Sequence, residues 1–469
     1  MTENKILLAG YTFLLCIVCF FLFKQTAASL WGDELWTLHK TLVDYPDLLT
    51  PGFLGDVNYP TKIIIFKTFS DLANTNSPAI LVLLNLINLI FIGLSLYILR
   101  NYLSLKTFLI FISILLSSEF FLRMFLEIGV YSFLLGISCL LSSWYIKIAV
   151  FKDESLFYLM MLTGIILASL HPFSGLFVCS VLFSLFFFIK DLSKRIVLSI
   201  CLCFPVVFLY IFSIEFIDGN QISHINLSFK QVLNTVGFMI PAVLLFSCLF
   251  LLRYKDMKED LFFMSKIALP LILSLGFILI FSLIFQPVFQ ARYFTTFFPF
   301  TCLLIIIYGK KNTDKLTTIS LIVCIFAVSM FYGPRSSLPY TNFQALIEQS
   351  HTKACINSPI FFNNTKNASY ETYMTEVYKR ASEIYSKDFQ RPLKDFPYII
   401  SNIDKLIEQF PNCSIFGISG QKKQDVFVSG MMDQLNLDKD TANITIKETL
   451  VKNCYKPGCG ILWTFQKTR

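Results

Sequence analysis

The stretch PAILVLLNLINLIFIGLSLYIL, residues 78–99, contains no charged side chain and is long enough as a helix to cross the hydrocarbon core of a bilayer. Similar apolar runs recur along the 469-residue chain, which is 55% hydrophobic and only 15% charged. A soluble protein has about 25% charged residues, so this composition predicts a mainly α-helical, polytopic membrane protein with about 11 spans. The predicted spans are residues 5–24, 78–99, 104–122, 125–146, 155–170, 173–190, 196–215, 232–252, 267–286, 294–309 and 316–332.

Basic residues beside the spans predict the orientation. With the N-terminus in the cytoplasm, the Lys- and Arg-rich connections, such as KDLSKR (190–195) and GKKNTDK (309–315), are also cytoplasmic. An odd number of spans then leaves the C-terminal segment outside. The net charge of +8 is explained by this topology and indicates no nucleic-acid partner. We therefore expect a multi-pass protein of the bacterial inner (plasma) membrane, surrounded by membrane lipids.

The chain divides into two predicted domains, a transmembrane domain over residues 1–333 and a soluble extracytoplasmic domain over residues 334–469. In the second domain, helical patterns alternate with short β-like runs, which predicts a small α/β fold. Its four cysteines are even in number and lie on the oxidising side, so disulfides are expected, with Cys454–Cys459 as one pairing. The β-like runs are PIFF (359–362), CSIFGI (413–418) and GILWTF (460–465).

The first outside connection contains SLWGDELWTLHK, residues 29–40, which places the adjacent carboxylates Asp33 and Glu34 between two tryptophans. The segments 32–49 and 61–72 each have the pattern of a helix lying flat on the membrane. Carboxylates near hydrocarbon are costly and indicate a partner or a function. The alternative is that the pair lies at the N-terminal end of an interfacial helix, where negative charge is favoured.

Further polar residues fall on the same predicted side of the membrane. Each has a structural alternative as well as a substrate-binding one: Glu127 can bond to a neighbouring helix, His171 can end a helix before Pro172, and Lys62 can extend toward the interface. For Arg292, a substrate-binding role is favoured over a structural one, because its sequence neighbours are almost all apolar. These candidate binding residues are Arg292, Tyr293, His171, Glu127, Tyr131 and Lys62, with Lys67 and Arg123 as further basic residues nearby in the sequence.

These residue types fit one reaction. A carboxylate base removes the proton of a hydroxyl acceptor, while a cation stabilises a phosphate leaving group. Asp33 or Glu34 facing Arg292 across an outer-leaflet cavity would supply both, and arginine suits phosphate because its planar group donates hydrogen bonds in pairs. The four histidines all lie on the outer side but none are paired at ligand spacing, so we assign no metal ligand and leave a divalent metal open.

Several motifs resemble those of the C-type (GT-C) glycosyltransferases, whose relatives include the protein O-mannosyltransferases and the lipid A aminoarabinose transferase. The acid pair after the first span is similar to the start of that family, and four further motifs follow in the family's order. They are NYPTKIIIFKTF (58–69), FLEIGVYSFLLGISCLLSSWYI (125–146), LASLHPFSGLF (167–177) and QARYFTTFFPF (290–300).

The resemblance implies a glycosyltransferase that moves a sugar from a polyprenyl-phosphate donor to a glycan, lipid or protein acceptor on the extracytoplasmic face. It implies that Asp33 acts as the base with Glu34 in support, and that basic residues hold the carrier phosphate. The chain departs from the family at two positions, because Asn58 replaces a histidine and Gly129 replaces an arginine.

Two other classes of function stay open from the sequence. A transporter or flippase for a lipid-linked saccharide would carry its charged groups at mid-bilayer, whereas the notable ones here cluster at one face. A non-enzymatic assembly protein would use the outside domain to bind a partner, and would tolerate the loss of Asp33 and Arg292.

Overall fold

The computed structural model divides the chain into two compact units, and each is described by itself. The first comprises Met1–Thr26 and Val43–Gly333, and the second comprises Ala27–Leu42 and Pro334–Arg469. The residues that the structure describes are 32–42, 44–47, 60–74, 77–116, 124–125, 127–218, 257–284, 291–309, 347, 355–362, 368–385, 393–395, 402, 405–406, 408–411, 413, 415–419, 444–450 and 461–467.

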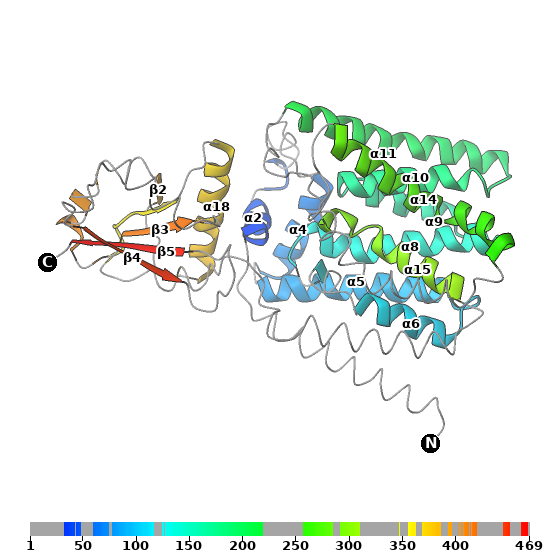
Figure 1. Ribbon diagram of the computed structural model, residues 1–469, viewed down its shortest axis with the longest axis horizontal. Helices are drawn as coiled ribbons and strands as arrows, with labels where there is room; N and C mark the ends of the chain where they lie inside the picture. The colour runs from blue at the N-terminus through cyan, green and yellow to red at the C-terminus, as the bar shows by residue number, and fades with distance from the viewer. Residues whose placement is uncertain are drawn as a thin grey trace, which may run out of the picture. The chain divides into compact units, whose positions relative to one another are not determined.

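The first unit is a bundle of apolar helices that lie side by side (Figure 1). Some serine hydroxyls within the bundle are satisfied by their own helices: Ser142 and Ser184 each donate to a carbonyl one turn earlier, at 2.6 Å. The elements are α4 (Pro60–Leu72), α5 (Ser77–Leu99), α6 (Leu105–Leu116), α8 (Val130–Phe151), α9 (Phe157–Ala168), α10 (Pro172–Leu185), α11 (Leu192–Asp218), α14 (Met257–Ile284), the 3-10 helix η3 (Ala291–Phe294) and α15 (Phe298–Gly309).

Helix α8 is the central helix of this unit and contacts α5, α9, α10, α14 and α15. It packs tightly against α5 at Gly136, where the side-chain Oδ1 of Asn88 accepts a hydrogen bond from the Gly136 N–H at 3.0 Å. At the other end of α8, the hydroxyl of Tyr145 donates to the carbonyl of Ile267 on α14 at 3.3 Å. The position of α8 is therefore fixed by specific polar contacts as well as by apolar packing.

Two of the described helices are long and apolar enough to cross a membrane, Ala79–Leu99 and Val130–Phe151. Shorter apolar helices accompany them at Phe157–Ala168, Pro172–Leu185, Ile267–Ile280 and Phe298–Ile307. The count of about 11 spans stays a prediction. The predicted spans 5–24, 232–252 and 316–332 lie outside the described residues.

Three helix ends differ from those that the sequence predicted. Helix α8 begins at Val130 rather than at residue 125, because residues 127–129 form a bend in which Gly129 is extended, with φ −157°. Helix α14 begins at Met257, within a segment predicted to be a connection. The predicted interfacial helix over residues 32–49 is shorter, since α2 spans only Gly32–Lys40.

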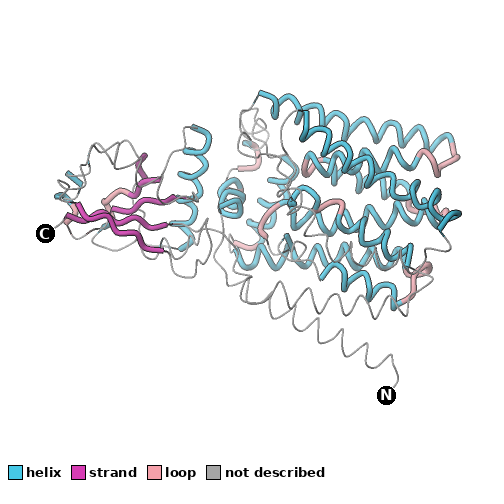
Figure 2. The backbone as a smooth tube through the Cα atoms, viewed as in Figure 1, coloured by secondary structure: helices cyan, strands magenta, loops and turns pink. Residues whose placement is uncertain are grey.

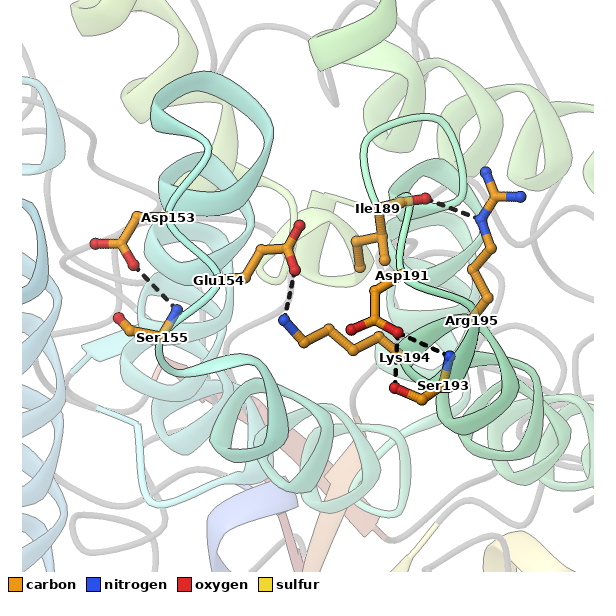
Figure 3. Close-up of polar contacts among 8 residues, drawn as sticks. All are labelled: Asp153, Glu154, Ser155, Ile189, Asp191, Ser193, Lys194 and Arg195. Atoms are coloured by element: carbon orange, nitrogen blue, oxygen red, sulfur yellow. Dashed lines mark hydrogen bonds and ion pairs between the residues drawn. The ribbon is translucent and has the colours of Figure 1, made fainter.

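Polar contacts join the connections at the end of the bundle that holds the C-terminus of α8 (Figure 3). Lys194 donates to Glu154 at 2.6 Å, and Arg195 Nε donates to the carbonyl of Ile189 at 2.8 Å. Tyr102 donates to Asp153 at 2.6 Å, which is the main reason that the pKa of this carboxyl group lies well below its usual range. These contacts fix the loops that the sequence predicts to be cytoplasmic.

The second unit contains a five-stranded mixed sheet in the order β2-β1-β3-β5-β4 (Figure 2). Strand β1 is parallel to β2 and β3, whereas β5 is antiparallel to β3 and β4. A disulfide joins Cys355 to Cys413, and helix α2 packs on α18. The elements are α2 (Gly32–Lys40), β1 (Ile360–Phe362), α18 (Ala368–Tyr385), β2 (Leu393–Asp395), β3 (Ile415–Ser419), β4 (Ile444–Leu450) and β5 (Ile461–Lys467).

The sequence assigned residues 32–40 to the membrane domain, whereas α2 groups with the second unit through its contact with α18. Disulfides were expected in this domain, and the pairing of Cys454 with Cys459 stays a prediction. The structure joins Cys355 to Cys413, with their Cα atoms 5.4 Å apart, and Cys454 and Cys459 are not among the described residues.

Candidate functional site

Four rings from three separate elements of the first unit meet in one group, which we call the aromatic cluster: Tyr131, His171, Phe173 and Tyr293. Tyr131 is in the first turn of α8, His171 and Phe173 are at the start of α10, and Tyr293 is in η3. The Tyr131 hydroxyl lies 3.2 Å from His171 Nε2, and the rings of Phe173 and Tyr293 stack with centroids 4.3 Å apart. The structure therefore brings together three of the binding residues that the sequence predicted.

The turn between α9 and α10 holds His171 in place. His171 is the N-cap residue of α10, and Pro172 follows at a position where a missing N–H costs nothing. His171 Nδ1 accepts the N–H of Phe173 at 3.3 Å, and Ser174 Oγ contacts the carbonyls of Leu167 and His171, each at 2.6 Å. The predicted structural role of His171 at a helix end is thus confirmed, and its other ring nitrogen faces Tyr131.

Glu127 lies in the bend immediately before α8, not within a helix as the sequence predicted. Its side chain is buried, and a Cβ atom added to Gly129 would lie 2.7 Å from Glu127 Oε1. The carboxylate is therefore folded against the backbone at the N-terminal end of α8, where negative charge is favoured by the helix dipole. The bond from Glu127 to a neighbouring helix, which the sequence offered as the alternative to substrate binding, stays a prediction.

The aromatic cluster lies where the N-terminal ends of α8 and α10 meet. The contact between Tyr131 and His171 fixes these two ends beside each other. Helix N-termini favour anions, because their amide dipoles point the positive end outward. Helix α8 is 22 residues long, so the cluster lies roughly 30 Å from the basic connections at the other end of the same helix.

The remaining basic candidates are Arg292, Lys62, Lys67 and Arg123. Arg292 directly precedes Tyr293 in η3, and its side chain is outside the described part of the structure. Lys62 is half-buried on α4. Lys67, on the same helix, lies 3.7 Å from Asp71 and 4.9 Å from the ring centre of Tyr45, which supports a structural role for that lysine. Arg123 falls outside the described residues.

Asp33 and Glu34 occupy the first turn of α2 in the second unit. This position agrees with the alternative that the two carboxylates lie at the N-terminal end of a helix, where negative charge is favoured. The side chain of Glu34 is buried. Farther along α2, His39 Nε2 lies 2.9 Å from Glu376 Oε2 on α18. Burial lowers the pKa of His39, against the opposing effect of the Glu376 carboxylate.

The predicted pairing of Asp33 with Arg292 stays a prediction, because the two residues belong to different units. The described residues contain no group of three or more metal-binding side chains. Sequence reasoning missed Phe173, although the HPF tripeptide that contains it had been singled out for its histidine. The only sequence signal for Phe173 was its position, as an aromatic residue two positions after a histidine that caps a helix.

The sequence matches no protein-family model and no curated protein. The structure is similar to the crystal structure of ArnT from Cupriavidus metallidurans in the apo state, with a TM-score of 0.51 and 10% sequence identity over 98% of both chains. A second ArnT crystal structure, bound to undecaprenyl phosphate, gives a TM-score of 0.48 at 10% identity, again over 98% of both chains. The first likeness shows a shared fold of the GT-C type, which the sequence motifs predicted.

Proposed function

We propose that this protein is a membrane glycosyltransferase that takes its sugar from a polyprenyl-phosphate donor and acts on the extracytoplasmic face. The observation that carries the proposal is the aromatic cluster at the meeting point of two helix N-termini, within a GT-C-type fold. The fold that the chain shares with ArnT agrees with the resemblance of its sequence motifs to the GT-C glycosyltransferases. The sugar and the acceptor of this chain are not assigned.

The chemistry of the aromatic cluster suits a phosphate-linked sugar. Phenol O–H groups donate to phosphate oxygens, and two helix N-termini favour the negative charge. The stacked rings of Phe173 and Tyr293 offer an apolar face to a sugar or an isoprenoid chain. Arg292, next to Tyr293 in the chain, is the proposed cation for the phosphate.

The proposed reaction is a displacement at the anomeric carbon of the donor. The acceptor oxygen forms a bond to that carbon, the bond from the carbon to the phosphate oxygen breaks, and the polyprenyl phosphate leaves with the electron pair. A carboxylate takes the proton of the acceptor hydroxyl, and we assign this role to Asp33, with Glu34 in support. The proposed donor-binding site contains Tyr131, His171 and Tyr293, whereas Lys62 is a weaker candidate and Glu127 mainly supports the start of α8.

Two features support the extracytoplasmic assignment. The Cys355–Cys413 disulfide in the second unit is typical of an oxidising compartment. In the first unit, the aromatic cluster and the Lys- and Arg-rich connections lie at opposite ends of α8, as the positive-inside rule predicts for an outer-face site. The N-terminus is then cytoplasmic, in the inner membrane of a bacterium.

The test is a transfer assay with purified protein, a panel of polyprenyl-phosphate sugars and a panel of glycan, lipid and protein acceptors, in which release of polyprenyl phosphate is measured. We expect release by the wild type, and a loss of about 100-fold or more in Asp33→Asn and Tyr293→Ala. The matched controls are Asp44→Asn and Tyr158→Ala, since both residues are exposed and lie outside the proposed site. Undiminished release by Asp33→Asn would remove that residue from the mechanism.

A further inference from the structure

The side chain of His171 makes two different contacts through its two ring nitrogens. Nδ1 accepts a hydrogen bond from the backbone N–H of Phe173 at 3.3 Å, as the N-cap of α10. Nε2 lies 3.2 Å from the hydroxyl oxygen of Tyr131 on α8. One side chain therefore closes the end of one helix and also contacts a polar group on another.

The first contact fixes the protonation of the ring. A nitrogen that accepts a hydrogen bond has its lone pair free, so Nδ1 of His171 carries no proton. The neutral imidazole then carries its proton on Nε2, and the Nε2–H is the donor to Tyr131. The helix cap thus selects the tautomer, and the tautomer sets the direction of the second hydrogen bond.

The direction of that bond determines how the phenol is used. Because the Tyr131 oxygen accepts from His171, the proton of the Tyr131 hydroxyl is directed away from the imidazole. The phenol then presents a donor where the N-terminal ends of α8 and α10 meet. A donor in that environment suits an anionic oxygen.

We propose that His171 is a positioning residue, which holds the Tyr131 hydroxyl as a fixed hydrogen-bond donor to the phosphate of a polyprenyl-phosphate donor. The inference rests on the proposed function for the identity of the ligand. The pairing of His171 with Tyr131 rests only on the geometry of the first unit.

The aromatic contacts support a fixed orientation. The ring centroid of His171 lies 5.2 Å from that of Tyr131, 5.7 Å from that of Phe173 and 5.9 Å from that of Tyr293. The imidazole is therefore enclosed on several sides by rings from three elements. Rotation of the imidazole would break the N-cap bond and the contact with Tyr131 at the same time.

The test separates the capping role of His171 from its positioning role. Asparagine is a strong N-cap residue, so His171→Asn keeps an acceptor for the Phe173 N–H but has no group that reaches Tyr131. His171→Ala removes both contacts, and Tyr131→Phe removes only the hydroxyl. The double variant His171→Asn/Tyr131→Phe completes a cycle that measures the coupling between the two side chains.

Binding is measured with a short-chain polyprenyl phosphate in lipid nanodiscs, and thermal stability is measured on the same samples. We expect Tyr131→Phe to weaken binding by about 10- to 100-fold, as for the loss of a hydrogen bond to a charged group. His171→Asn should weaken binding by about 3- to 30-fold at nearly wild-type stability, and the double variant should bind no more than about 2-fold worse than Tyr131→Phe. His171→Ala should also be less stable.

Nitrogen NMR of ¹⁵N-histidine-labelled protein gives an independent readout, because the chain contains only four histidines. The signal lost in His171→Asn identifies His171, and we expect it to show a protonated Nε2 and an unprotonated Nδ1 that shift in Tyr131→Phe. A protonated Nδ1, or wild-type binding by His171→Asn, would overturn the inference. If the wild type binds no polyprenyl phosphate, the ligand and the proposed function both fail, although the histidine signal would still report the pairing.

Discussion

The contact between α5 and α8 predicts that alanine at Gly136 destabilises the helix bundle. A Cβ atom at this position would lie 2.6 Å from Asn88 Oδ1 and 2.9 Å from Asn88 Cα. The second distance involves backbone, so no side-chain rotation relieves it. The two helices must move apart by about 0.5 Å, the difference between 2.9 Å and the 3.4 Å at which ordinary contact begins.

We expect Gly136→Ala to lower the free energy of unfolding by about 1–3 kcal/mol, as is typical of overpacked sites. The hydrogen bond from the Gly136 N–H to Asn88 stretches at the same time. Because Tyr131 is in the first turn of the same helix, binding of a polyprenyl phosphate should also weaken. Thermal unfolding of the full chain in detergent, followed by circular dichroism, measures the stability.

The matched control is Gly93→Ala on α5, where an added Cβ meets nothing within 4 Å. Alanine there should leave stability unchanged or raise it by up to about 1 kcal/mol, through the better helix propensity of alanine. The two variants make the same chemical change in neighbouring helices and differ only in the space available. Equal melting temperatures for Gly136→Ala and Gly93→Ala would refute the close approach of α5 and α8.

Replacing Cys355 and Cys413 by alanine should destabilise the second unit by about 4 kcal/mol, from the loop-closure entropy of a sequence separation of 58, and chemical denaturation of the full chain measures this loss. The pKa of His39 is lower in the folded chain than in the unfolded chain, so the unfolded chain binds the proton more tightly than the folded chain does. The free energy of unfolding should therefore fall as the pH drops below about 6.5. His39→Gln should remove this pH dependence from melting curves recorded at a series of pH values. Tyr102→Phe removes the 2.6 Å hydrogen bond to Asp153 and should cost about 1 kcal/mol, with faster amide hydrogen exchange in the connection after α8. If amide hydrogen exchange in that connection is the same in Tyr102→Phe as in the wild type, the Tyr102–Asp153 hydrogen bond does not anchor the connection.

The apolar helices were predictable from the sequence, but their ends were less so. The apolar residues before Glu127 extend the hydropathy of α8 backwards, whereas the chain bends at residues 127–129 and the helix begins at Val130. The charged turns at the start of α14 look like a connection, since hydropathy detects only the part of a helix that crosses hydrocarbon. A helix that continues into the aqueous phase has no hydropathy signal at its end.

The sequence predicted which residues belong to the candidate site, but it did not predict how their side chains contact one another. The motifs singled out Tyr131, His171 and Tyr293 one by one, and the structure brings their rings together. Spacing along the chain gave no means of finding that Phe173 stacks on Tyr293. The contact of α2 with α18 joins residues more than three hundred positions apart, and no local pattern encodes it.

The central claim is that the protein cleaves the bond between a sugar and a polyprenyl phosphate, and does not merely move the lipid. Sealed proteoliposomes that contain a labelled polyprenyl-phosphate sugar allow both events to be measured, since cleavage releases polyprenyl phosphate and movement exposes the sugar to the opposite side. We predict release of polyprenyl phosphate when an acceptor is supplied, with no faster movement between leaflets than in empty vesicles. Movement of the intact donor without any release would contradict the account.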